Sequence, residues 1–172
     1  MSILHRAAII LALLTAALST SFGARAETLP APSGRVILTV SGAVTAGNAP
    51  GSARFDFAML DAMATETLAT STPWTQGPQK FDGFRLATLL KRVGATGSGL
   101  KATALNDYAT TMPIAEALAD GAFVAIRQNG QPMSVRDRGP LWIVFPYDSD
   151  PRLTTDAVLN RSVWQLKELV VD

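Results

Sequence analysis

Short apolar runs separated by glycine and proline constrain this chain more than any other feature. The 172 residues include 13 glycines and 10 prolines, which recur between the apolar runs beyond residue 26. Glycine and proline interrupt helices and strands, so each element has to be short. Many short strands with two or three short helices predict a single α+β domain with mixed β-sheets. The sequence shows no internal repeat and no linker to a second domain.

Residues 1–26 have the pattern of an export signal. A positively charged start is followed by an apolar run from Ala7 to Leu18, and residues 24–26 form an Ala-x-Ala cleavage site. The apolar run is too short to cross a bilayer. We therefore expect cleavage after this site and a periplasmic protein. A flexible lead-in over residues 27–34 would precede one domain over residues 35–172.

The composition of the exported chain excludes several classes of chemistry. Cysteine is absent, and the only histidine, His5, leaves with the signal. Zinc sites built from cysteine and histidine, Ser-His-Asp triads and cysteine nucleophiles are therefore impossible. A calcium or magnesium site with oxygen ligands stays open, but the Asp148-Ser149-Asp150 triplet lacks the glycine and the distal glutamate of an EF-hand loop, so no metal site is expected. Without Arg6 and Arg25 the charges nearly balance, and they are scattered along the chain. Such a distribution provides no basic surface for nucleic acid.

The expected elements follow from local residue patterns. Helices are predicted at residues 57–63, 86–93 and 114–119, the first capped by Asp56, while residues 43–53 read as a loop. Strands are predicted where β-branched or apolar residues alternate or run together. These strands cover residues 35–41, 65–72, 79–84, 101–105, 108–112, 123–127, 131–133, 141–145 and 162–171.

Four clusters of polar and aromatic residues stand at expected strand ends or loops, where binding sites commonly lie. Together they offer a flat aromatic face, carboxylates and guanidinium groups. This set suits a planar, nitrogen-rich heterocycle, because an aromatic ring stacks on it and a carboxylate accepts paired hydrogen bonds from its edge. The clusters are residues 71–75, 106–108, 136–140 and 145–151.

Each cluster also has a purely structural explanation. Asn106-Asp107 is a common turn pair, and Arg136-Asp137-Arg138 can form an ion-pair clasp that orients its own loop. For Trp142 and Trp164 the structural explanation is favoured, because both lie in apolar runs where large aromatic side chains usually pack.

Six segments carry a family resemblance, namely residues 36–42, 71–75, 81–84, 103–108, 134–143 and 146–151. They resemble small exported proteins of the sulfite-oxidase fold, which are described as molybdopterin-binding oxidoreductase-like. The resemblance covers about residues 35–171 and implies a single sulfite-oxidase-like molybdopterin-binding domain. Catalytic members bind molybdenum through a cysteine, but the corresponding window, residues 67–72, contains only threonine, leucine, alanine and serine. A hydroxyl is a poor substitute for this soft ligand, so no molybdenum is expected.

Cysteine-lacking members of this group resemble periplasmic pterin-binding regulators. Such proteins hold a reduced pterin and work with a membrane-bound cyclic-di-GMP enzyme that has a periplasmic sensory region. The resemblance therefore implies a pterin ligand, this kind of protein partner and no catalysis. Two alternatives stay open, namely a molybdopterin-dependent oxidoreductase with a degenerate metal site and an interaction module without a small ligand.

Pterin chemistry assigns roles to the candidate residues. Trp74, with Tyr147 as the second candidate, would stack on the bicyclic ring. Asp107 or Asp137 would accept hydrogen bonds from the 2-amino group and N3–H. The alternative for Asp137 is that it pairs only with the neighbouring arginines.

The remaining candidates would bond the rest of the pterin. Arg136 or Arg127 would donate to the 4-oxo group. Tyr108, Ser71 and Thr72 would bond the other ring nitrogens or the side-chain hydroxyls of the pterin.

Overall fold

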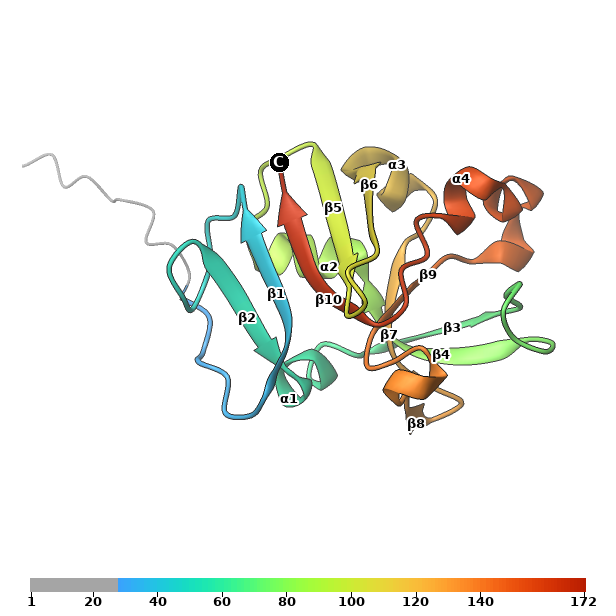
Figure 1. Ribbon diagram of the computed structural model, residues 1–172, viewed down its shortest axis with the longest axis horizontal. Coiled ribbons are helices and arrows are strands. Elements are labelled where there is room, and N and C mark those ends of the chain that lie inside the picture. Colours follow the sequence, from blue (N-terminus) through green and yellow to red (C-terminus); the bar gives the residue numbers. More distant parts are fainter. Residues whose placement is uncertain (1–27) are drawn as a thin grey trace, which may run out of the picture.

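Two five-stranded sheets form the framework of the domain in the computed structural model, which describes residues 28–172 (Figure 1). In spatial order, the first sheet contains β2 (Ser52–Asp56), β1 (Val36–Gly42), β10 (Leu166–Val171), β5 (Gly99–Ala104) and β6 (Ala109–Pro113). The second contains β3 (Glu66–Thr70), β4 (Gln79–Arg85), β7 (Phe123–Gln128) and β8 (Gln131–Pro132), with β9 (Trp142–Val144) also paired to β7. Neighbours are antiparallel, except that β1 and β10 run parallel.

The helices are short and connect or cover the strands. The α-helices are α1 (Phe57–Asp61), α2 (Leu86–Arg92), α3 (Ile114–Ala119) and α4 (Asp156–Leu159). Three further single turns are 3₁₀ helices, namely η1 (Val135–Asp137), η2 (Tyr147–Ser149) and η3 (Pro151–Thr154). Within residues 28–172, none of the helices is long and apolar enough to cross a membrane. The expected α+β class, with mixed sheets and short helices, is confirmed.

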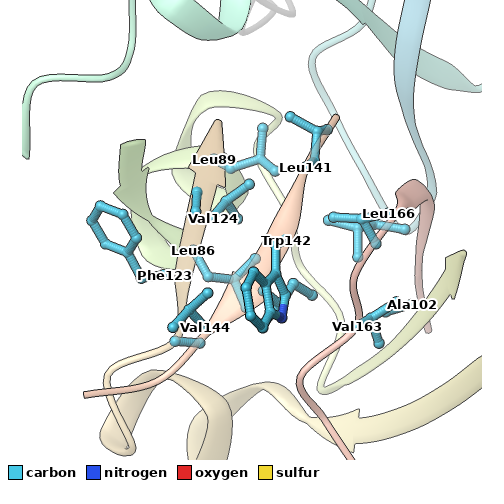
Figure 2. Packing of buried hydrophobic residues seen from close by; sticks show 14 of the residues in the cluster. Leu86, Leu89, Ala102, Phe123, Val124, Leu141, Trp142, Val144, Val163 and Leu166 are labelled. Carbon is cyan, nitrogen blue, oxygen red and sulfur yellow. The ribbon is translucent and has the colours of Figure 1, made fainter. Parts of the chain in front are cut away.

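Both sheets contribute side chains to one continuous hydrophobic core. Trp142 on β9 is fully buried, and Figure 2 shows it among aliphatic side chains that include Val124, Val144 and Val163. The predicted apolar face of residues 86–93 points into the same core, because Leu86 and Leu89 are fully buried. The loops that follow β9 and α4 therefore pack against this core.

Two strand predictions need correction. Residues 43–53 were expected to form a loop, but β2 begins at Ser52 and pairs along β1. Its polar residues mask a strand in which Ala53 and Phe55 face the core. The closing strand was expected from residue 162, but β10 begins at Leu166 because Gln165 has a φ of 54°, which interrupts extended backbone.

Residues 28–34, which belong to the predicted lead-in, are packed against the domain. Leu29 is buried, and its backbone N–H donates to the carbonyl of Gly47 at 3.2 Å. The Asn48 amide donates to the carbonyl of Pro30 at 2.8 Å. The predicted export signal lies outside the described residues.

Asp56 fixes both the lead-in and the start of α1. Its carboxylate accepts hydrogen bonds from the backbone N–H groups of Met59 at 2.9 Å, Ser33 at 2.8 Å and Gly34 at 2.7 Å. The first of these bonds is the helix cap that the sequence predicts. Because they favour the ionised form, these bonds lower the pKa of Asp56, the one from Met59 most strongly.

The lowered pKa predicts a pH-dependent contribution of Asp56 to stability. A carboxylate whose pKa is lower in the folded state stabilises the fold fully above its ordinary pKa, near 3.8, and loses that contribution as the pH falls through the folded value. We expect the unfolding free energy of wild type to fall over this acidic range more steeply than that of Asp56→Asn. Urea unfolding of both proteins between pH 2.5 and about 5 measures the difference. Parallel pH profiles would contradict the assigned role.

Candidate functional site

A pocket of about 310 Å³ lies where three loop segments meet at the edge of the core. The loop after β3, the turn between β5 and β6, and the chain from the end of α4 toward β10 form its walls. Its lining is aromatic, aliphatic and polar but carries no charged side chain. The lining residues are Trp74, Asn106, Tyr108, Leu159, Asn160, Ser162, Val163 and Trp164.

All three tryptophans of the chain meet at this pocket or directly behind it. The rings of Trp74 and Trp164 line it, with centroids 5.3 Å apart and planes at 75°. Trp142 lies behind them, 5.9 Å from Trp74, and its indole N–H is the one buried side-chain polar atom without a partner among the described residues. The two lining rings form a corner, so a flat ligand that stacks on one meets the edge of the other.

Polar groups face the pocket from the β5–β6 turn and from the end of α4. The Tyr108 hydroxyl donates to the backbone carbonyl of Asn160 at 3.0 Å, and the Asn106 side-chain oxygen accepts from the Tyr108 N–H at 3.2 Å. In residues 28–172 the Asn160 side-chain amide makes no hydrogen bond. This amide is therefore free to offer a donor and an acceptor to a ligand.

Tyr147 lies behind the pocket wall, with only 4% of its surface exposed. Its ring contacts Trp74 edge-on at 6.2 Å, and its hydroxyl is hydrogen-bonded to that of Ser162. Burial raises the pKa of Tyr147 to about 12, and the bonds with Ser162 and Phe145 oppose this shift more weakly. The hydroxyl is therefore protonated at neutral pH and orients Ser162, which lines the pocket.

The Trp74 loop is held by its own hydroxyls and by a distant arginine. The Thr72 and Thr75 hydroxyls are 2.8 Å apart, and the Thr72 oxygen accepts from the Trp74 N–H at 3.2 Å. Arg138 donates to the Trp74 carbonyl at 2.7 Å, and its guanidinium lies over the Trp142 ring at 5.5 Å. Ser71 is fixed from another side, because its N–H donates to Asp148 at 2.6 Å. Arg138 thus joins two predicted clusters.

Two of the predicted ligand-binding residues face other partners. The Asp107 carboxylate is paired with Lys167 at 2.6 Å, and this hydrogen bond lowers its pKa. Arg127 forms an ion pair with Asp61 on α1 and lies over the Phe57 ring at 5.3 Å. Neither side chain lines the pocket.

The η1 residues do not line the pocket either. Asp137 accepts from the Ser134 hydroxyl at 2.7 Å and, among the described residues, forms no ion pair with its neighbouring arginines. Arg136 is exposed on the same turn. Of the nine predicted residues, Trp74 and Tyr108 line the pocket, while Ser71, Thr72 and Tyr147 support its wall.

Six lining residues were not among the predicted ones, namely Asn106, Leu159, Asn160, Ser162, Val163 and Trp164. The cluster at residues 106–108 signals Asn106, whereas Asn160 and Ser162 stand in no recognisable motif. Trp164 was expected to pack, and it both packs and lines the pocket.

The electrostatic surroundings of the pocket are neutral. Arg161 follows Asn160 in the chain, but its guanidinium is paired with Glu116 at 2.6 Å and Asp120 at 3.4 Å. Over residues 28–172, no group of three or more histidine, cysteine, aspartate or glutamate side chains is arranged to hold a metal ion. The arrangement therefore suits an uncharged, flat ligand with hydrogen-bonding edges.

Comparison with known proteins identifies the family. A model described as the oxidoreductase molybdopterin binding domain matches residues 56–148. The matched region includes the Trp74 loop, the β5–β6 turn and η1, but it ends before α4. No curated protein matches the sequence significantly. Because the match spans more than half of the chain, the protein belongs to the oxidoreductase molybdopterin-binding domain family.

Proposed function

We propose that this protein is a non-catalytic periplasmic pterin-binding protein that relays the presence of a reduced pterin to a membrane-bound cyclic-di-GMP enzyme. The observation that carries the proposal is the uncharged aromatic pocket with the free amide of Asn160. Export and the nature of the partner are supported by the signal pattern of residues 1–26 and by the resemblance to periplasmic regulators.

The molybdenum cofactor that the family implies does not fit this site. Its dithiolene and phosphate are anionic, and its metal takes a cysteine ligand in catalytic relatives. The chain has no cysteine, and no cationic side chain lines the pocket. A buried phosphate without a cation would be strongly unfavourable. The volume of about 310 Å³ is also at the lower end of the range of roughly 300–1,000 Å³ for ligand pockets.

A free pterin matches the pocket in shape and in hydrogen-bonding groups. Its flat bicycle can stack on Trp74 while its edge meets Trp164. Its 2-amino group and N3–H donate and its 4-oxo group accepts, and an asparagine amide supplies both counterparts. We assign these contacts to Asn160, with Asn106 as the second amide. We thus assign to neutral side chains the hydrogen bonds that the sequence analysis assigned to carboxylates and guanidinium groups.

Neither the residues that line the pocket nor Tyr147 behind its wall suit proton transfer. With its pKa raised to about 12, Tyr147 is a poor acid or base near neutral pH. The lining residues themselves are amide, hydroxyl, aromatic and aliphatic. We therefore assign the pocket to binding.

Ligand charge provides the sharpest test of this function. We expect dihydroneopterin to bind with a 1:1 stoichiometry, and we expect its triphosphate to bind no more tightly, because no cation lines the pocket. Anaerobic isothermal titration measures both affinities, and tryptophan fluorescence reports contact with the indole corner. Absence of heat and of any fluorescence change for reduced pterins would refute the proposal. Tighter binding of the triphosphate would place the ligand at a cationic site elsewhere.

The family match keeps a second function in view, a molybdopterin-dependent oxidoreductase with a degenerate metal site. Metal analysis of protein produced in a periplasm that supplies molybdopterin separates the two functions. Stoichiometric molybdenum would favour the oxidoreductase, whereas metal-free protein that binds a reduced pterin favours the regulator.

A further inference from the structure

Ser162 is the most deeply buried polar residue that lines the pocket. Only 4% of its surface is exposed, although it lines the hollow together with Asn160. The other polar lining residues, Asn106, Tyr108 and Asn160, are exposed. A ligand that reaches Ser162 therefore meets it away from water, where a mismatch between donors and acceptors costs the most affinity.

Two hydrogen bonds fix the orientation of the Ser162 hydroxyl. It is bonded to the Tyr147 hydroxyl, and it donates to the backbone carbonyl of Val158 at 3.3 Å. Tyr147 keeps its proton at neutral pH, because burial raises its pKa to about 12, and within residues 28–172 its hydroxyl is bonded to Ser162 alone. Tyr147 must therefore donate to Ser162, since the opposite direction would leave a buried hydrogen without an acceptor.

This directed chain determines what Ser162 can offer to a ligand. A serine hydroxyl has one hydrogen and two acceptor positions. The hydrogen is directed to Val158, and Tyr147 takes one acceptor position. A single acceptor position remains for the pocket. Ser162 therefore favours a ligand N–H and opposes a ligand nitrogen that carries only a lone pair.

Oxidation of a pterin changes this property at its ring nitrogens. N8 carries a hydrogen in dihydroneopterin and in the tetrahydropterins, whereas N5 and N8 of the oxidised ring carry only lone pairs. The 2-amino group, N3–H and 4-oxo group, which we assign to Asn160, are present in all of these forms. The amide of Asn160 can therefore hold the ring in each redox state, and the state itself is distinguished at another residue.

We propose that Ser162 accepts a hydrogen bond from the N8–H of a reduced pterin, and that the pocket thereby discriminates against the oxidised ring. This inference rests on the proposed pterin function and assigns its redox selectivity to one side chain. Ser162 is the specificity-determining residue. Tyr147 is a positioning residue, because its own hydrogen keeps the serine hydrogen directed away from the ligand.

The selectivity of the wild-type protein is measured with dihydroneopterin and neopterin, which have the same side chain and differ in the hydrogens at N8 and C7. In anaerobic calorimetry we expect neopterin to bind about 10- to 100-fold more weakly, because it loses one buried hydrogen bond and places a lone pair against Ser162. Equal affinities would overturn the inference while the pterin function stands. If neither compound binds, the pterin function and the inference fall together.

Two substitutions should remove the selectivity by opposite routes. Ser162→Ala deletes the acceptor, so dihydroneopterin should lose about tenfold in affinity while neopterin loses none. Tyr147→Phe keeps the ring that contacts Trp74 but frees the serine hydrogen to turn toward N8. In this variant neopterin should gain about tenfold in affinity, while the affinity for dihydroneopterin stays close to that of wild type.

Ser149→Ala is the matched control. The Ser149 hydroxyl donates to the carbonyl of Pro146 at 2.7 Å on an exposed turn outside the pocket, so both affinities should equal those of wild type. A purely structural role of Ser162 would lower both affinities of Ser162→Ala together and leave their ratio unchanged, and this result would overturn the inference. An unchanged ratio in Tyr147→Phe would overturn the positioning role of Tyr147. Circular dichroism of each variant confirms that folding is retained.

Discussion

Replacing Trp74 by alanine is expected to weaken tetrahydropterin binding about 10- to 100-fold. The indole of Trp74 lines the pocket and forms its corner with Trp164. Stacking of a heterocyclic base on an aromatic side chain contributes roughly 1–3 kcal/mol, and each 1.4 kcal/mol or so changes an affinity tenfold. Anaerobic calorimetry of wild type and Trp74→Ala measures the loss. Trp74→Phe retains a smaller flat face, so its affinity should lie between the two.

The same substitution distinguishes a binding tryptophan from a core tryptophan. Trp74 is only partly buried, and its backbone carbonyl, which accepts from Arg138, survives the change to alanine. We therefore expect the loss of unfolding free energy to remain below the roughly 3–5 kcal/mol typical of a buried tryptophan. Wild-type affinity in a folded Trp74→Ala protein would remove Trp74 from the site. A loss of both folding and binding would instead assign it to the core.

Much of the fold was predictable because the decisive signals are local. The apolar spacing at residues 86–93 produces α2, and the Asn129-Gly130 turn joins β7 to β8. Asn129 and Gly130 both have positive φ, the conformation that favours this residue pair. β2 escaped prediction because its alternation of polar and apolar residues extends over only five residues and contains just two apolar ones, Ala53 and Phe55. The strand becomes evident only from its pairing with β1.

The site was harder to predict because its charged candidates have partners far along the chain. Asp107 pairs with Lys167 and Arg127 with Asp61, at separations of 60 and 66 residues. Nothing local in the sequence indicates these pairs, and each removes a charged group from the pocket. Trp74 and Tyr108 were predictable as aromatic side chains beside turn residues. Asn160 reaches the pocket only through α4, a helix of four residues for which the sequence has no periodic signal.

The change from charged to neutral lining also bears on the ligand. A carboxylate would select the donor edge of a pterin, whereas an asparagine amide can turn to meet either a donor or an acceptor. Because the side-chain amide of Asn160 makes no hydrogen bond within residues 28–172, the pocket can adjust to the redox state of the ring without a change in protonation. This property suits a protein that binds a pterin and signals its presence better than it suits an enzyme that converts the pterin.

Replacing Trp142 by alanine is expected to lower the free energy of unfolding by roughly 3–5 kcal/mol, the range for a fully buried tryptophan. Trp142 is completely buried on β9 and contacts Phe81, Trp74 and Trp164 edge-on. Its removal leaves a cavity between the second sheet and the chain after α4. For a protein of this size, such a loss lowers Tm by on the order of 10 °C. Urea unfolding and thermal melting measure it.

Trp142→Phe is the matched control, because it keeps an aromatic ring but removes the indole N–H. That N–H is buried without a partner among the described residues, and an unsatisfied buried donor costs roughly 1–3 kcal/mol. The two effects oppose each other, so Trp142→Phe should lose only about 1–2 kcal/mol. A loss as large as that of alanine would mean that the N–H is satisfied. Because Trp142 does not line the pocket, Trp142→Phe should also bind tetrahydropterin as wild type does, unlike Trp74→Ala.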